Sequence, residues 1–231
     1  MRSPHDDSHH RPRTLGAILF EGFELLDLYG PLEMFGCLGN DLQIETIAER
    51  SGPVASSPGP ASVAVHSFDD CPDFDLYLIP GGQGVFTQQD NPTLLDFLRR
   101  RNERAELIMT VCNGAAIAAS AGLLDGRRAT TNKIFFDSVE SRSDKIDWVH
   151  EARWIDAGPI ATASGVSAGM DMALAMIARL YGDARAEAVA IVTEYEWHRE
   201  SDRDPFHTYL NQTQWIAQAV GLTGNDGESP A

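Results

Sequence analysis

The sequence has few positive charges and no long apolar run. It holds 18 lysine and arginine residues against 34 aspartate and glutamate residues, a formal net charge of −16. A chain this acidic repels phosphate backbones, so we expect no nucleic acid among its partners. No stretch of about 18 apolar residues is present to span a membrane, so we expect no membrane partner either.

Cysteine is scarce as well. The chain has three cysteines, Cys37, Cys71 and Cys112. Their spacing fits no metal-ligand pattern, and an odd number cannot form a complete disulfide framework. We therefore expect no metal and no cofactor, and a reducing cytoplasm as the location of the protein.

The length and composition predict one domain. A chain of 231 residues with 43% hydrophobic content can bury one sizeable core, whereas two domains would be cramped. We expect a polar, flexible tail over residues 1–13, a single domain over 14–210, and a partly disordered C-terminal segment over 211–231.

Strand-like and helix-like runs alternate along this domain, which predicts an α/β fold with a mainly parallel sheet and helices on both faces. In such a sheet the active groups lie at the carboxyl ends of the strands. A Gly/Pro/Ser-rich hairpin is expected at 51–62, and a helix is expected to have Pro31 in its first turn. We expect strands at 14–20, 42–49, 63–68, 75–79, 107–111 and twice within 148–164, and helices at 91–104, 114–124, 167–182 and 183–197.

One cysteine lies where a strand is expected to meet a helix. In "MTVCNGAAIAASAGLL" (109–124), Cys112 follows a run of apolar β-formers and precedes small, helix-permissive residues. A strand-to-helix turn presents its central side chain beside free N–H groups, which would lower the pKa of the thiol. The alternative is that Cys112 is a small buried hydrophobe.

Two further loops are expected at the same edge of the sheet. In "IPGGQGVF" a glycine N–H of Gly81 or Gly82, with the N–H of Asn113, would form an oxyanion pocket beside Cys112; a tight turn is the alternative use of these glycines. In "ELLDL" the carboxylate of Asp27 has apolar neighbours, which would raise its pKa and suit it to proton exchange. Capping of the helix near Pro31 is the alternative role for Asp27.

Four stretches together resemble the ThiJ/PfpI superfamily: "LLDLYGPLEMF", "DLYLIPGGQGV", "TVCNGAAIAASAGLLDGRRATT" and "ASGVSAGMDMAL". The resemblance covers residues 14–185 and implies a flavodoxin-like sandwich that forms a homodimer and acts on a small-molecule substrate. It also implies that Cys112 is the reactive cysteine, on a nucleophile elbow, and that Asp27 is its acidic partner. Within the superfamily these motifs are most similar to those of the isonitrile hydratase branch. This similarity implies a lyase that adds water to R–N≡C to give an N-substituted formamide. Asn132 stands where many relatives carry histidine, and we place it with Gly81, Gly82 and Asn113 among the oxyanion or substrate-binding residues.

Other functions stay open at this point. A glyoxalase-like or amidase activity would use the same cysteine, whereas a redox sensor or metabolite-binding module would use it without turnover. His198, in "YEWHRES", follows a helix-like run and is expected to be a solvated cap. Trp148, Trp154, Trp197 and Phe206 could line an apolar pocket, although such aromatics more often belong to a core or an interface.

Overall fold

The fold is built on one twisted sheet, seen in a computed structural model that describes residues 11–212. Its seven strands follow the order β10-β11-β7-β6-β1-β2-β5, and every neighbouring pair is parallel except β10 with β11. The strands are β1 (Arg13–Ile18), β2 (Leu42–Ala48), β5 (His66–Ser67), β6 (Leu76–Ile79), β7 (Leu107–Val111), β10 (Trp154–Asp156) and β11 (Ile160–Ala163). The mainly parallel sheet expected from the alternating pattern is confirmed.

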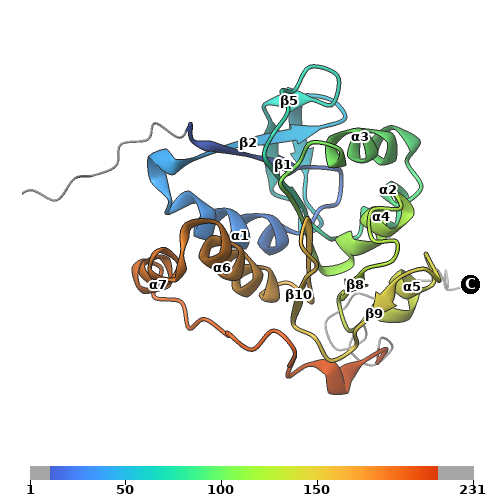
Figure 1. The fold of residues 1–231 in the computed structure, drawn as a ribbon. Helices are drawn as coiled ribbons and strands as arrows, with labels where there is room; N and C mark the ends of the chain where they lie inside the picture. The colour runs from blue at the N-terminus through green and yellow to red at the C-terminus, as the bar shows by residue number, and fades with distance from the viewer. Residues whose placement is uncertain (1–10, 213–231) are drawn as a thin grey trace, which may run out of the picture.

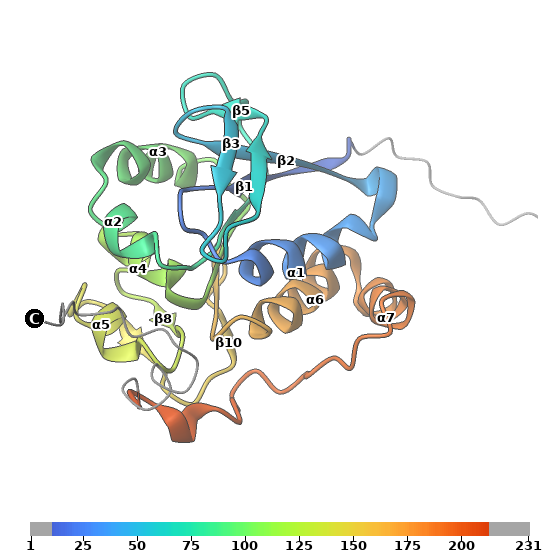
Figure 2. The same ribbon diagram turned by 180° about the vertical axis from the view of Figure 1, so that it is seen from behind.

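Helices cover both faces of this sheet (Figure 1; Figure 2, from behind). One layer consists of α1 (Leu25–Gly36), α6 (Ala168–Tyr181) and α7 (Asp183–Val192), in which α1 packs on α6 and α6 packs on α7. The opposite layer holds α2 (Val85–Gln88), α3 (Pro92–Asn102), α4 (Ala115–Ser120) and α5 (Phe136–Glu140). The result is a sandwich of three layers.

Smaller elements complete the described part of the chain. The expected hairpin is formed by β3 (Gly52–Ala55) and β4 (Ala61–Ala64), and β8 (Arg128–Ala129) pairs with β9 (Asp147–Trp148). Three short 3-10 turns are η1 (Gly39–Asp41), η2 (Cys112–Gly114) and η3 (His207–Tyr209). After α7 an extended segment, orange to red in Figure 1, passes below β10 and ends in the short turn η3.

The central strands are buried because helices lie on both of their faces. All residues of β6, β7 and β11 are buried, so these strands read as continuous apolar runs rather than alternating ones. Aromatic rings fill the space between the sheet and α3, where Phe97 stacks on Phe68 with ring centroids 4.3 Å apart. This rigid centre fixes the ends of the strands that carry the site.

Several boundaries differ from the expectation: α7 ends at Val192 rather than at residue 197, and the strand expected at 63–68 is divided between β4 and β5. The first helix begins at Leu25, so Pro31 lies inside it rather than in its first turn. An interior proline is normally costly because it removes a hydrogen bond, but this one is buried, with Gly169 of α6 close beside its ring. The helix after Cys112 ends at Ser120, not at residue 124, and a turn with Gly122 in a positive-φ conformation follows it.

The predicted terminal segments mostly lie outside the described residues, which cover only 11–13 and 211–212 of them. Within residues 11–212, none of the helices combines the length and the apolar character needed to cross a membrane.

Candidate functional site

Cys112 occupies a sharp turn at the carboxyl end of β7. Its φ of 58° is a left-handed conformation that non-glycine residues rarely adopt and that costs of order 1–3 kcal/mol. The surroundings hold the turn in place, because the Cys112 N–H donates to the Ser164 carbonyl at 2.9 Å and its own carbonyl accepts from Thr131 Oγ1 at 2.8 Å. A strained strand-to-helix turn of this kind presents a nucleophile.

Asp27 lies beside this thiol, in the first turn of α1. It has no exposed surface, and its Oδ2 accepts the Gly81 N–H at 2.9 Å. The Cys112 side chain lies beside this carboxyl group and acts to lower its pKa, while Asp27 Oδ1 has no hydrogen-bond partner among the described residues. Burial raises the pKa of Asp27 to about 7, against the opposing effects of the Gly81 hydrogen bond and of Cys112. The alternative role as a helix cap is not observed, since Glu24 precedes the helix and makes no side-chain cap.

The glycine pair has a different role from the one expected. The Gly81 N–H is bonded to Asp27, and the Gly82 N–H donates to Asn113 Oδ1 at 2.8 Å, while Asn113 Nδ2 donates back to the Gly82 carbonyl at 3.1 Å. Both glycine N–H groups are therefore already used, and neither is free to receive an oxyanion. Gly81 instead allows close approach, because a Cβ there would lie 2.7 Å from Asp27 Oδ2 and 2.8 Å from Cys112 Cβ.

Three other donors face the sulfur atom. The backbone N–H groups of Asn113 and Val166 and the side chain of Asn132 lie near the Cys112 thiol, and all three act to favour its thiolate form. Asn132 is held by its Oδ1, which accepts the Ile134 N–H at 2.8 Å. The sequence does not predict a role for Val166, because every residue except proline has a backbone N–H and the residue type therefore gives no signal. The adjacency of β11 and β7 is the signal that could have located its loop.

Burial nevertheless dominates the acidity of the thiol. Burial, followed by the charge of Asp27, raises the pKa of Cys112 well above its usual range, and the three donors only partly oppose this. The lowered pKa expected from the helix dipole is therefore wrong for the free protein. The reason is structural: α4 has only six residues, and Cys112 is 6% exposed.

A pocket of about 410 Å³ opens next to these donors. Asn132 and Val166, which both lie near the thiol, belong to its lining. Phe206 and Tyr209 come from the C-terminal part of the chain and form another wall. The remaining lining residues are Lys133, Ile134, Ser164, Gly165, Ser167 and Asp204.

The other residues considered in the sequence lie elsewhere. The His198 N–H donates to Asp171 Oδ1 at 2.8 Å, and Trp154 is part of the hydrophobic core. Of the aromatic residues proposed for a pocket, Phe206 is the one that lines it. Within residues 11–212, no group of three or more His, Cys, Asp or Glu side chains is arranged to hold a metal ion.

Comparisons with known proteins agree with this architecture. The profile of the DJ-1/PfpI family matches residues 15–179. An isonitrile hydratase from Pseudomonas putida is 33% identical over 181 residues, which make up 78% of this chain and 78% of that protein. A deglycase from Thermococcus kodakarensis is 26% identical over 149 residues, 64% of this chain and 84% of that protein.

The fold has close solved counterparts. The crystal structure of a ThiJ/PfpI family protein from Pseudomonas syringae superposes with a TM-score of 0.77 at 29% sequence identity, covering 94% of this chain and 93% of that one. The family profile spans most of the sandwich, from β1 into α6. By sequence and by structure, the chain belongs to the DJ-1/PfpI family.

Proposed function

We propose that this protein is a cysteine-dependent hydratase that adds water to a small isonitrile, R–N≡C, to give the formamide R–NH–CHO. The observation that carries the proposal is the burial of Asp27 and Cys112 side by side, since a Cβ on Gly81 would lie 2.7 Å from Asp27 Oδ2 and 2.8 Å from Cys112 Cβ. The carbon of an isonitrile accepts both a nucleophile and a proton. A thiol and a carboxyl that share one proton can supply both.

The first half-reaction uses that shared proton. Above about pH 7 the pair holds one proton, on the thiol, because the pKa of Asp27 is about 7 and that of Cys112 is higher. Asp27 takes the thiol proton as Sγ forms a bond to the isonitrile carbon. The carbon lone pair then takes the same proton from Asp27, which leaves the thioimidate R–N=CH–S–Cys112.

Water completes the cycle. Asp27 accepts a proton from water as the oxygen bonds to the thioimidate carbon, and the electron pair of the C=N bond moves to nitrogen, which takes that proton. The hydroxyl proton then leaves through Asp27 to sulfur while the C–S bond breaks. Formamide is released, and the pair again holds one proton. The N–H groups of Asn113 and Val166 and the Asn132 side chain support the sulfur while it carries negative charge.

The pocket supports an apolar substituent R. Phe206, Tyr209 and Ile134 line it, and its volume of about 410 Å³ is that of a small-molecule site rather than a polypeptide cleft. A redox sensor is less well supported, because a thiol with a raised pKa stays protonated and reacts slowly with oxidants. In the hydration, by contrast, the thiol proton is itself transferred to the substrate.

The test is formamide formation from an aryl isonitrile, measured by chromatography with the wild-type protein, Cys112→Ala, Asp27→Asn and the control Cys37→Ala. We expect turnover by the wild type and by Cys37→Ala, none by Cys112→Ala, and a loss of about 100-fold or more in Asp27→Asn. Turnover that survives Cys112→Ala, or a folded wild type that yields no formamide, would refute the hydratase.

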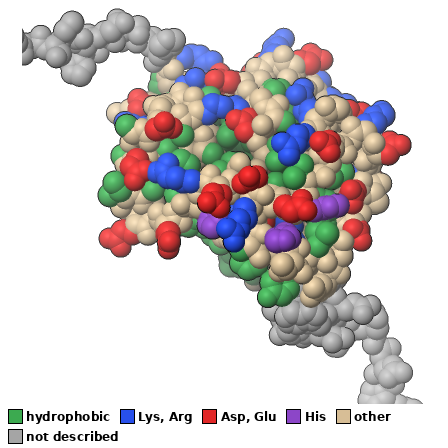
Figure 3. Space-filling view, turned by 60° about the horizontal axis from the view of Figure 1, so that its bottom comes forward, with side chains coloured by type: hydrophobic (Ala, Val, Ile, Leu, Met, Phe, Trp, Pro, Cys, Tyr) green, Lys and Arg blue, Asp and Glu red, His purple; other side chains and the backbone are tan. Residues whose placement is uncertain are grey.

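The proposal extends to the assembly and location of the enzyme, a homodimer in the cytoplasm. Some apolar side chains are exposed at the surface, among them Val63 of β4, which is 63% exposed, and Val192 of α7, which is 74% exposed. Their exposure supports contact with a second copy of the chain. On the face in Figure 3, Lys and Arg side chains are interspersed with Asp and Glu rather than gathered in one basic patch. The mass of the protein in solution, measured by light scattering, tests the dimer, and the mass of a single chain would contradict it.

A further inference from the structure

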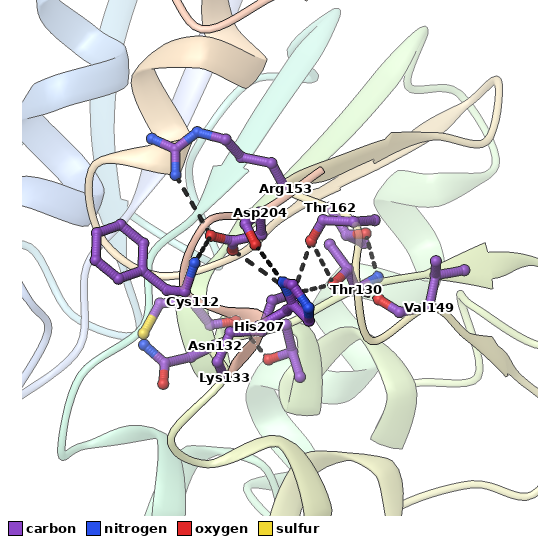
Figure 4. A network of polar contacts seen from close by, with 12 residues as sticks. Cys112, Thr130, Asn132, Lys133, Val149, Arg153, Thr162, Asp204 and His207 are labelled. Atoms are coloured by element: carbon purple, nitrogen blue, oxygen red, sulfur yellow. Dashed lines mark hydrogen bonds and ion pairs between the residues drawn. The ribbon is translucent and has the colours of Figure 1, made fainter. Parts of the chain in front are cut away.

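Four buried charges lie beside the site without touching the thiol. They are Lys133 and Arg153, which are positive, and Asp171 and Asp204, which are negative, and each side chain is at most 7% exposed. Burying ions without partners is very costly, so such groups persist where they pair with one another. Figure 4 shows three of them, Lys133, Arg153 and Asp204, next to Cys112 and Asn132.

Asp204 is the centre of this cluster. Its Oδ2 lies 3.7 Å from Lys133 Nζ, and its Oδ1 lies 3.8 Å from an Arg153 guanidinium nitrogen. The same Oδ1 accepts the Phe206 N–H at 2.9 Å, and the Asp204 N–H donates to the Glu151 carbonyl at 2.6 Å. This carboxylate thus pairs the C-terminal part of the described chain with two separate loops, and at the second it adds to the closer contact of Arg153 with Asp171, at 2.6 Å.

The first of these loops presents Asn132. Lys133 is the next residue, and its Nζ is fixed by the Ala152 carbonyl at 2.6 Å and by Thr130 Oγ1 at 3.0 Å. Burial lowers the pKa of Lys133 to about 8, and the charge of Asp204 acts in the opposite direction to keep the ammonium protonated. The side chain of Asn132, which lies beside the Cys112 thiol (Figure 4), therefore extends from a loop anchored on Asp204.

The second loop presents Val166. The Arg153 carbonyl accepts the Ser164 N–H at 2.8 Å, and the Arg153 guanidinium lies 3.4 Å from Ser167 Oγ. Val166, between those two serines, has a φ of 30°, an unfavourable conformation for a β-branched residue. A strained backbone of this kind persists only where its surroundings hold it.

We propose that Asp204 is a positioning residue for Cys112: through Lys133 and Arg153 it fixes the two loops whose Asn132 side chain and Val166 N–H face the sulfur atom. This inference rests on the assignment of Cys112 as the nucleophile in the proposed function. It makes the C-terminal segment part of the active site, although none of its residues is bonded to the thiol in the hydrogen bonds described above.

The test is the rate at which iodoacetamide alkylates Cys112 at about pH 9, followed by mass spectrometry of the Cys112 peptide, in the wild type and Asp204→Asn. Asparagine keeps the shape and the acceptor for the Phe206 N–H but removes the charge. We expect labelling to slow about tenfold, because losing one donor to a charged sulfur raises the thiol pKa by about one unit. Cys37 in the same sample serves as the internal reference.

The direction of the change separates positioning from a merely structural role. Removal of a nearby negative charge alone, or loosening of the fold around a buried thiol, would make Cys112 react faster, not slower. Asp156→Asn is the matched control, because Asp156 pairs with Arg179 at 2.6 Å on the outer strand β10, and it should label like the wild type.

A second variant guards against misfolding. The double variant Asp204→Asn, Lys133→Met removes one charge of each sign. The net charge of the cluster is therefore unchanged, while the ion pair between Asp204 and Lys133 is lost. Slow labelling of either folded variant supports the proposal, and wild-type or faster labelling of both overturns it. Because labelling needs no isonitrile, a wild type that fails to hydrate isonitriles would refute the proposed function without deciding this inference.

Discussion

Replacing Asp27 by asparagine should make the protein more stable at alkaline pH while lowering its activity about 100-fold or more. Burial raises the pKa of Asp27 from 3.8 to about 7 in the folded protein. A carboxyl whose pKa is raised by folding gives stability that is fully present below pH 3.8 and is lost as the pH rises through about 7. The asparagine side chain does not titrate, and its oxygen can still accept the Gly81 N–H.

The magnitude follows from these two pKa values. Between about pH 5 and about pH 8.5 the ionisation of Asp27 removes about 3 kcal/mol from the free energy of unfolding. The variant should avoid this loss. Lys133, whose pKa is about 8, titrates in both proteins, so its contribution cancels in the comparison.

The assay is urea unfolding followed by tryptophan fluorescence at both pH values. The control is Glu33→Gln, which removes an exposed carboxylate from the same helix. We expect the wild type and the control to lose stability together, and Asp27→Asn to lose about 3 kcal/mol less. If all three proteins lose the same stability between the two pH values, Asp27 is not buried in the ionisable state described here.

Three further predictions concern the site itself. Gly81→Ala should lower the melting temperature and abolish turnover, because its Cβ would lie 2.7 Å from Asp27 Oδ2; overpacking of this kind costs about 1–3 kcal/mol. Gly36→Ala, with nothing within 4 Å of the added Cβ, is the control, and equal melting temperatures for the two would contradict the argument. Phe206→Ala should raise KM for an aryl isonitrile by up to about tenfold with little change in kcat, since it removes a pocket wall, whereas Phe86→Ala, outside that lining, should leave KM unchanged. In the wild type, kcat/KM for hydration should rise with pH through about 7, as Asp27 ionises and becomes able to take the thiol proton; a rate that falls over this range would exclude that order of proton transfer.

The sequence predicted those parts of the site that depend on local pattern. The apolar run before Cys112 and the small residues after it were enough to place a turn at that cysteine, because a buried strand and an Ala-rich helix have distinct compositions. The apolar neighbours of Asp27 likewise predicted its raised pKa, which the structure supports.

The parts that could not be predicted depend on contacts between distant residues. Local rules place Pro31 in a first helical turn because they penalise an interior proline, whereas packing against α6 decides its position. The N–H groups of Gly81 and Gly82 are used by side chains from other loops, and Asp204 reaches Lys133 from a distant part of the sequence. No periodicity in the sequence carries such information.

The short α4 helix and the depth of Cys112 have a consequence for chemical proteomics. General thiol probes report cysteines that are already ionised and open to solvent, and this cysteine is neither. Surveys with such probes near neutral pH would therefore rank it among the slowly reacting cysteines. An electrophile shaped to fill the neighbouring pocket, and able to take up the thiol proton as it reacts, should label it selectively over Cys37 and Cys71.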